Sequence, residues 1–265
     1  MLHFVEGLFI PKMPLQFAST AGEFRTISGG ADGTRRSLVS PAESSGTGTA
    51  SGLEYTNNNT GKSSTWTVMC WMKWADSINS ASIFASTTGA EQIWTGTTSD
   101  NKINARCYNN RQANSSNNAV TADTWHHLCV HFGINFESTK DVEVYIDNVS
   151  VASVSNGNAI NELGEDNATY WVLQDDGADL DWDGRVFDFI AIEGSIVDPT
   201  SGNYSTASGG EWTNYTGSYG TNGFRLDGQN TGDAGWDTSG NGHHFTQSAG
   251  GGVTTLDASD IPPGA

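Results

Sequence analysis

Short runs of alternating apolar and polar residues dominate this chain. In residues 64–74, STWTVMCWMKW, the even-numbered positions from Trp66 to Trp74 would share one face of a β-strand, and the odd-numbered positions from Thr67 to Lys73 the other. Both faces are rather apolar. We therefore expect a central strand that is covered on both sides, or on one side plus a loop.

Residues 124–154 contain two further runs with the pattern of β-strands, and the second run ends in a tight turn. From 126 to 132 the even-numbered residues are His, Leu, Val and Phe, and the alternation resumes at Val142, Val144 and Ile146. Asp147 and Asn148 tolerate left-handed backbone angles, so they can close a hairpin between the second run and the residues that follow it. We expect the two runs to place their apolar positions against one core. Its aromatic anchors would be Trp125, Tyr145 and Phe187.

Other segments carry the same kind of pattern, separated by Gly, Ser, Thr and Asn. We expect strands within residues 81–87, 91–97, 102–110, 168–176, 182–195, 224–228 and 243–248. This gives about a dozen strands and no helix. The sequence therefore predicts an all-β, antiparallel two-sheet sandwich.

Three parts of the chain differ in pattern. Residues 1–18 are apolar and contain Pro11 and Pro14, so they predict an extended N-terminal arm that buries against its own domain or a neighbouring subunit. Its attachment residues would be Phe4, Phe9 and Ile10. Residues 19–250 would form the sandwich, and residues 251–265 a loose C-terminal tail.

Composition and charge exclude several classes of protein. Of 265 residues, 36% are hydrophobic, 10% are aromatic and 32 are glycine, which suits a β domain with a sizeable core. The formal charge of −18 would repel phosphate backbones, so we expect no nucleic-acid partner. No signal peptide or membrane span is evident, and we expect a soluble chain made in a cytoplasm. Cys70, Cys107 and Cys129 predict reduced, mostly buried thiols rather than a disulfide framework or zinc site.

Two late segments carry a resemblance to a known family. Residues 215–227, YTGSYGTNGFRLD, and 237–245, DTSGNGHHF, together with 124–148 and 182–200, resemble the concanavalin A-like and laminin G-like jelly rolls of tailed-bacteriophage virion proteins. The resemblance covers roughly residues 35–248. Within it, Gly217, Gly220 and Gly223 would serve turns that need positive φ.

The resemblance implies a non-enzymatic structural protein of a phage virion. The chain is little longer than one domain, which favours a capsid decoration, head fibre or tail accessory over a whole long tail fibre. The expected partners are other virion proteins, bound through the arm, and the expected location is the virion, assembled in the host cytoplasm. A homo-oligomer such as a trimer would suit a symmetry axis of the particle.

A lectin-type module that binds glycans is the main alternative, and host-surface glycans would be its ligands. Exposed aromatic rings stack on the C–H faces of sugars. The candidate glycan or partner contacts, all in or near expected loops, are Trp94, Tyr108, Trp182, Trp212 and Tyr219. The same residues could instead anchor the core or contact another subunit.

A glycoside hydrolase is the third alternative. Glucanases on the scaffold that the chain resembles use Glu-x-Asp-x-Glu along one strand, whereas Asp179, Asp181 and Asp183 alternate here without a Glu. We therefore expect no catalytic residues and no required cofactor. The acidic segment could hold calcium through Asp175, Asp176, Asp179, Asp181 and Asp183, or it could be a solvated acidic loop.

Overall fold

The structure is a computed structural model. It describes residues 36–40, 52–58, 63, 65–74, 81–86, 92–95, 100–107, 111–133, 141–155, 168–174, 184–199, 214–230, 232–248, 253–255 and 261–262. These residues form fifteen strands and no helix. The described part of the chain accordingly offers no helix that is long and apolar enough to cross a membrane.

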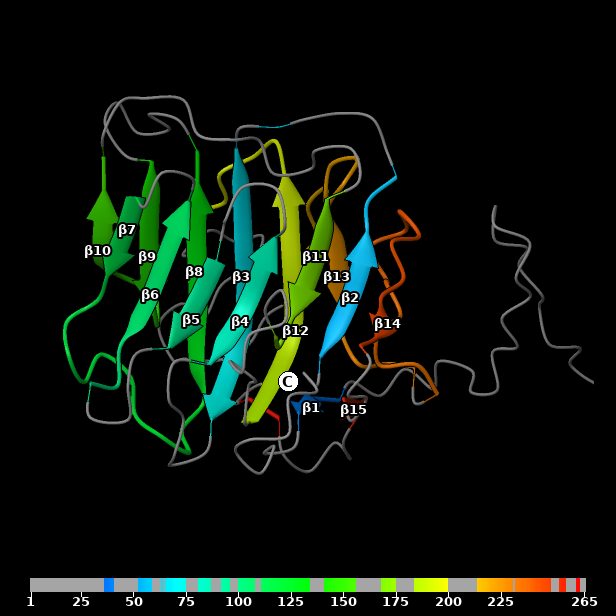
Figure 1. The fold of residues 1–265 in the computed structure, drawn as a ribbon, viewed down its shortest axis with the longest axis horizontal. Helices are drawn as coiled ribbons and strands as arrows, with labels where there is room; N and C mark the ends of the chain where they lie inside the picture. The colour runs from blue at the N-terminus through cyan, green and yellow to red at the C-terminus, as the bar shows by residue number, and fades with distance from the viewer. Residues whose placement is uncertain are drawn as a thin grey trace, which may run out of the picture.

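The strands build two antiparallel sheets that lie one behind the other (Figure 1). One sheet has eight strands: β1 (Leu38–Ser40), β3 (Trp66–Trp74), β8 (His126–Phe132), β9 (Val142–Ile146), β10 (Val149–Val154), β12 (Gly184–Glu193), β13 (Phe224–Leu226) and β15 (Thr254–Thr255). Its order is β10-β9-β8-β3-β12-β1-β15, and β13 pairs with β12.

The second sheet has seven strands and faces the viewer in Figure 1. Its strands are β2 (Leu53–Thr56), β4 (Ser82–Ser86), β5 (Gln92–Thr95), β6 (Ile103–Cys107), β7 (Arg111–Asn114), β11 (Thr169–Val172) and β14 (Thr246–Gln247). Their order is β14-β2-β11-β4-β5-β6-β7. The predicted all-β, two-sheet jelly-roll sandwich is confirmed.

The main core fills the space between the two sheets. The even-numbered residues of β3 point into it, as the alternation predicts. Aromatic rings from both sheets meet there: Phe224 lies 4.7 Å from Phe245 and 5.9 Å from Phe189 between ring centroids, and Phe84 stacks on Tyr170. Each such side chain contributes about 1.5–3 kcal/mol by leaving water, so this layer dominates the stability of the domain.

A second apolar layer covers the outer face of the eight-stranded sheet. Met69, Cys129, Ile190 and Ile192 are buried there against Tyr215. The segment after β12 is held over this face at residue 67 of β3. The Thr67 hydroxyl donates a 2.9 Å hydrogen bond to the Ser195 carbonyl and accepts one of 3.0 Å from the Val197 N–H. The second alternative predicted for β3 is therefore observed, with the other sheet on one face and non-strand segments on the other.

The hairpin between β9 and β10 has the predicted turn. Asp147 and Asn148 have φ values of 49° and 67°, both in the left-handed region. The Asp147 carboxylate also accepts a 2.9 Å hydrogen bond from the His127 N–H and contacts His126 Nδ1 at 2.7 Å, which ties the turn to β8. Burial raises the pKa of Asp147, but these hydrogen bonds outweigh that effect, so the pKa is lowered.

The predicted aromatic anchors need correction. Phe187 is fully buried, but the pairing of β12 with β3 places it on the outer face of the eight-stranded sheet, opposite Trp71. Tyr145 is half-buried and packs against the outer layer, whereas Trp125 is half-buried and belongs to neither cluster. A β-bulge explains Phe187, because an extra residue between Phe187 and Ile190 shifts the alternation and points Phe189 into the core.

Sequence patterns missed four of the short strands, although they predicted the equally short β13 and β14. β1, β2, β7 and β15 are two to four residues long, too short to show an alternation above the surrounding polar sequence. β15 pairs with β1, so part of the expected loose tail is anchored to the sheet. The N-terminal arm, residues 1–18, lies outside the described residues.

The three cysteines are buried thiols, as expected. Burial raises the pKa values of Cys70 and Cys129, so both remain thiols at neutral pH. Neither has the electropositive surroundings of a reactive cysteine.

The structure favours glycine at the three motif positions for different physical reasons. Gly220 has φ +75°, as predicted, but Gly217 and Gly223 are not among the described residues with positive φ. A Cβ at Gly217 would lie 2.2 Å from the Tyr215 hydroxyl, and one at Gly223 would lie 1.9 Å from the Tyr219 carbonyl oxygen. Close approach of neighbouring groups, rather than backbone angle, requires glycine at these two positions.

Candidate functional site

The outer face of the seven-stranded sheet carries an ordered set of polar and aromatic side chains. Phe84, Ile93 and Ala105 lie in the core, so their neighbours along each strand point to the opposite face. Strand pairing then aligns one residue from each of six adjacent strands. We call this set the outer row: Glu54, Trp171, Ala85, Gln92, Arg106 and Gln112.

A second pair lies beside the outer row. Trp94 of β5 and Asn104 of β6 are direct partners in the sheet, two residues along their strands from Gln92 and Arg106. Asn104 is 3% exposed, whereas Trp94, Trp171 and Arg106 are half-buried. The indole rings are therefore fixed by the sheet but still present a surface.

Arg106 is positioned by an aromatic ring. Its Cζ atom lies 5.5 Å from the centroid of the Trp94 ring, within the range of a cation–π contact. Arg106 Nε and Asn104 Oδ1 are both buried and have no hydrogen-bond partner among the described residues. A donor and an acceptor that no described residue satisfies therefore lie next to a flat aromatic surface.

This arrangement has the chemistry of a saccharide platform. Flat rings accept the apolar C–H faces of a sugar, while amide and guanidinium groups bond its hydroxyl and acidic substituents. The row crosses six strands, so it spans about 24 Å at about 4.8 Å per strand. Glu54 lies toward one end of the row and Arg106 toward the other, so one end carries a negative charge and the other a positive charge.

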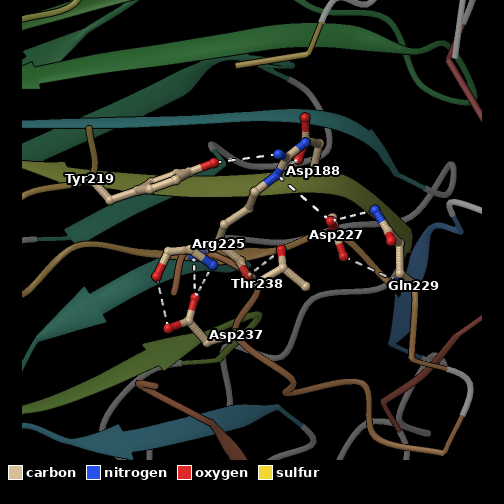
Figure 2. A network of polar contacts seen from close by, with 8 residues as sticks. Asp188, Tyr219, Arg225, Asp227, Gln229, Asp237 and Thr238 are labelled. Carbon is tan, nitrogen blue, oxygen red and sulfur yellow. Dashed lines mark hydrogen bonds and ion pairs between the residues drawn. The ribbon is translucent and has the colours of Figure 1, made fainter. Parts of the chain in front are cut away.

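A buried polar cluster lies at the other sheet (Figure 2). Arg225 of β13 donates from Nε to Asp188 Oδ1 of β12 at 2.6 Å, and the same Nε lies 3.8 Å from Asp227 Oδ2. Arg225 Nη1 donates to the Tyr219 hydroxyl at 3.4 Å. The side chain of Asp188 is fully buried and that of Asp227 is 2% exposed, so these charges are nearly withdrawn from water.

Electrostatics in this cluster follow from burial and pairing. Burial acts to lower the pKa of Arg225, but Asp188 outweighs it and the pKa is raised, so the guanidinium stays charged. Burial raises the pKa of Asp227 despite the opposing effect of Arg225. Burial likewise raises the pKa of Tyr219, which remains a phenol. The cluster is thus a fixed ion pair with a second carboxylate beside it.

The motif DTSGNGHHF is organised by one carboxylate of the same region. Asp237 accepts hydrogen bonds at Oδ1 from the N–H groups of Arg225, at 2.9 Å, and Ser239, at 2.8 Å. Its Oδ2 accepts from the Ser239 hydroxyl and the His243 N–H, both at 2.9 Å. The ring of His243 donates from Nε2 to the Thr221 carbonyl at 2.9 Å, because a carbonyl can only accept. Asp237 therefore links the two motifs of the resemblance.

The structure places two of the five predicted aromatic contacts. Trp94 lies beside the outer row in β5, within the strand expected in residues 91–97, and Tyr219 belongs to the buried Arg225 cluster. Outside the described residues lie Tyr108, Trp182 and Trp212, the attachment residues Phe4, Phe9 and Ile10, and the acidic set Asp175, Asp176, Asp179, Asp181 and Asp183. Among the residues that are described, no three His, Cys, Asp or Glu side chains form a metal-binding group.

Sequence reasoning missed Trp171, Arg106 and Asn104. The signal was present, because the alternation in residues 91–97, 102–110 and 168–176 assigns each of them to the face opposite the core. What the sequence lacked was the strand order. β11 lies between β2 and β4, so Trp171 comes into line with residues more than sixty positions earlier in the chain.

Comparisons with known proteins agree with this architecture. The family model of the concanavalin A-like lectin/glucanases superfamily matches residues 47–196. The structure is similar to that of a "putative carbohydrate binding protein" from Bacteroides ovatus, with 12% sequence identity and a TM-score of 0.61 over 86% of this chain and 62% of that one. It is also similar to the native heptameric SAP-like pentraxin from Limulus polyphemus, with 13% identity and a TM-score of 0.50 over 74% and 94% of the two chains. The curated protein sequences contain no match.

Proposed function

The chain belongs to the concanavalin A-like lectin/glucanases superfamily, and from this membership and the outer row we propose that it is a non-catalytic, lectin-type module that binds a glycan. The observation that carries the proposal is that Trp171 and Arg106, both half-buried, lie in one row across β11, β4, β5 and β6, with the half-buried Trp94 beside them. A rigid sheet holds these side chains without the need for a closing loop. The Bacteroides ovatus protein, whose name points to carbohydrate binding, has the same fold and supports the proposal.

The distribution of carboxylates favours binding over hydrolysis. Hydrolysis of a glycosidic bond uses two carboxyl groups that flank the bond. Among its members the outer row has one carboxylate, Glu54. Asp188 and Asp227 do lie close together, but they are buried around Arg225 and could not reach a polysaccharide.

Replacing Trp171 by alanine tests the binding site. We expect glycan affinity to fall about tenfold or more, the loss typical of a central aromatic contact, while the fold is retained. Binding partners would first be found on a glycan array, and affinities then measured by calorimetry for the wild type, Trp171→Ala and Trp94→Ala.

The matched control is Trp125→Ala, which removes a half-buried indole next to the other sheet. It should leave affinity unchanged, with folding of every variant checked by circular dichroism. Equal affinity of the Trp171→Ala protein and the wild type would contradict a site on the outer row. Binding to none of the glycans would contradict the proposed function itself.

Display on a phage virion is the second candidate, and it would provide the context in which a glycan is bound. It is supported by the resemblance of residues 215–227 and 237–245 to phage virion domains, since these two segments pack together around Arg225 and Asp237. In this proposal the protein is a homo-oligomeric decoration, head fibre or tail accessory that attaches to other virion proteins.

Deletion of residues 1–18 tests the attachment. We expect the shortened protein to be missing from purified particles while it still folds, because the arm is the proposed contact with other virion subunits. Quantitative mass spectrometry of particles would measure incorporation. Incorporation at the wild-type level would rule out this role of the arm.

Calcium remains a prediction for the acidic segment, Asp175, Asp176, Asp179, Asp181 and Asp183, which lies outside the described residues. The proposed glycan contacts on the outer row are side chains of the sheet itself. They require no cofactor.

A further inference from the structure

Arg106 differs from three other described cations of this acidic protein. Lys73 pairs with Asp123 at 3.1 Å, Lys102 with Asp100 at 3.0 Å and Arg225 with Asp188 at 2.6 Å. Arg106 makes no ion pair with a carboxylate of the described residues, although the chain has 30 acidic and only 12 basic residues. Where carboxylates are this abundant, a half-buried guanidinium without one is unusual.

We propose that the outer row recognises an acidic glycan, and that Arg106 binds the carboxylate of a uronic or sialic acid residue. The inference rests on the proposed function and adds the chemical class of the ligand. Arginine suits this role because its planar fork can form two parallel hydrogen bonds to one carboxylate.

The surroundings of Arg106 prepare it for such a ligand. The contact with the Trp94 ring restricts the guanidinium, so less conformational freedom is lost on binding. Among the described residues, neither the buried Nε of Arg106 nor Oδ1 of Asn104, on the same strand, has a hydrogen-bond partner. The side chain of Asn104 is 3% exposed. A sugar acid supplies both complements, a carboxylate for Arg106 and a hydroxyl for Asn104.

The net charge of −18 does not oppose this assignment at short range. At physiological ionic strength, charges more than about 8 Å apart across solvent are largely screened. Glu54, the carboxylate of the outer row, lies four strands from Arg106, or about 19 Å at about 4.8 Å per strand. Asp100, which precedes β6, is already paired with Lys102. Neither of these two carboxylates therefore opposes the binding of an anionic ligand at Arg106.

The test compares matched charged and neutral glycans. Trigalacturonate and its methyl ester share one sugar backbone, but the ester lacks the carboxylate charges, and 3′-sialyllactose differs from lactose by one sialic acid residue. Calorimetry would measure each with the wild type, Arg106→Gln, Arg106→Lys and the control Arg185→Gln, which removes the same charge from β12 of the other sheet. A glycan array would cover other carboxylated sugars.

We expect the wild type to prefer one charged glycan over its neutral partner, and Arg106→Gln to weaken that binding at least about tenfold. Arg106→Lys should recover part of the affinity, and Arg185→Gln should bind as tightly as the wild type. The glycan pair in which the charged member binds more tightly identifies the ligand as a uronic or a sialic acid. Binding of neutral glycans alone, or of acidic glycans with equal affinity by Arg106→Gln, would overturn the inference and leave the proposed function standing. Binding of no glycan would overturn both.

Discussion

Replacing Arg225 by methionine is expected to lower the free energy of unfolding by about 3–5 kcal/mol, the cost of breaking a buried ion pair from one side. Methionine retains much of the aliphatic stem, but it leaves the fully buried carboxylate of Asp188 without its partner. Asp227 also loses the nearest positive charge. Urea unfolding followed by tryptophan fluorescence would measure the change.

The stability lost in the Arg225→Met protein should be smaller at low pH than at neutral pH. Burial raises the pKa of Asp227 above its unfolded value, with Arg225 acting in the opposite sense. A carboxyl group with a raised folded pKa takes up a proton more readily in the native state, so its contribution is fully present below the unfolded pKa and is lost as pH rises through the folded pKa. Removing Arg225 raises that folded pKa further. The wild-type and Arg225→Met proteins should therefore differ less at pH 4.5 than at pH 7.5.

Two further variants make the result specific to the pair. Arg185→Met removes a half-buried arginine from β12, and we expect it to cost about 1 kcal/mol or less. Adding Asp188→Asn to Arg225→Met should restore part of the lost stability, since it removes the unpaired charge. Asparagine is chosen because residue 188 has φ +52°, a conformation that asparagine tolerates and alanine does not. Equal losses for Arg225→Met and Arg185→Met would show that the cluster is not a paired, buried site.

The sequence predicted the parts of this fold that depend on local alternation. The nine residues of β3, the shared core face of β8 and β9 and the Asp147–Asn148 turn all follow from period-two patterning and turn chemistry. Phe187 was misplaced because a bulge adds one residue between it and Ile190, and no pattern of apolar residues reveals an extra residue of this kind.

The candidate site was harder to predict because it depends on strand order. Trp94 was singled out from its residue type, as a residue in or near a loop. Its partners Asn104 and Arg106 come from β6, and Trp171 reaches the same face from a strand that follows β10 in the chain. Alternation assigns each residue to a face, whereas only the register of a folded sheet shows that these residues form a row.

Replacing Gly223 by alanine is the second large effect, with an expected loss of about 3 kcal/mol, at the upper end for an overpacked site. The added Cβ would lie 1.9 Å from the Tyr219 carbonyl oxygen and 2.6 Å from that of Ala191. Both are backbone atoms, so no side-chain rotation can relieve the clash. The backbone must move instead, and it leads directly into Phe224, whose ring is fully buried in the core.

Gly240→Ala separates this steric explanation from the conformational one. Gly240 has φ +94°, but nothing lies within 4 Å of a Cβ added there, so its substitution should cost only about 1 kcal/mol for the left-handed backbone. Gly223 has no positive φ, and its carbonyl accepts a 2.7 Å hydrogen bond from Asn241 Nδ2, so a displaced backbone would also loosen the contact between the two motifs. A loss at Gly223 no larger than that at Gly240, measured by urea unfolding, would mean that the backbone of residues 219–223 can yield. In that event the close packing of these motifs would not be what fixes glycine in the sequence TNGF.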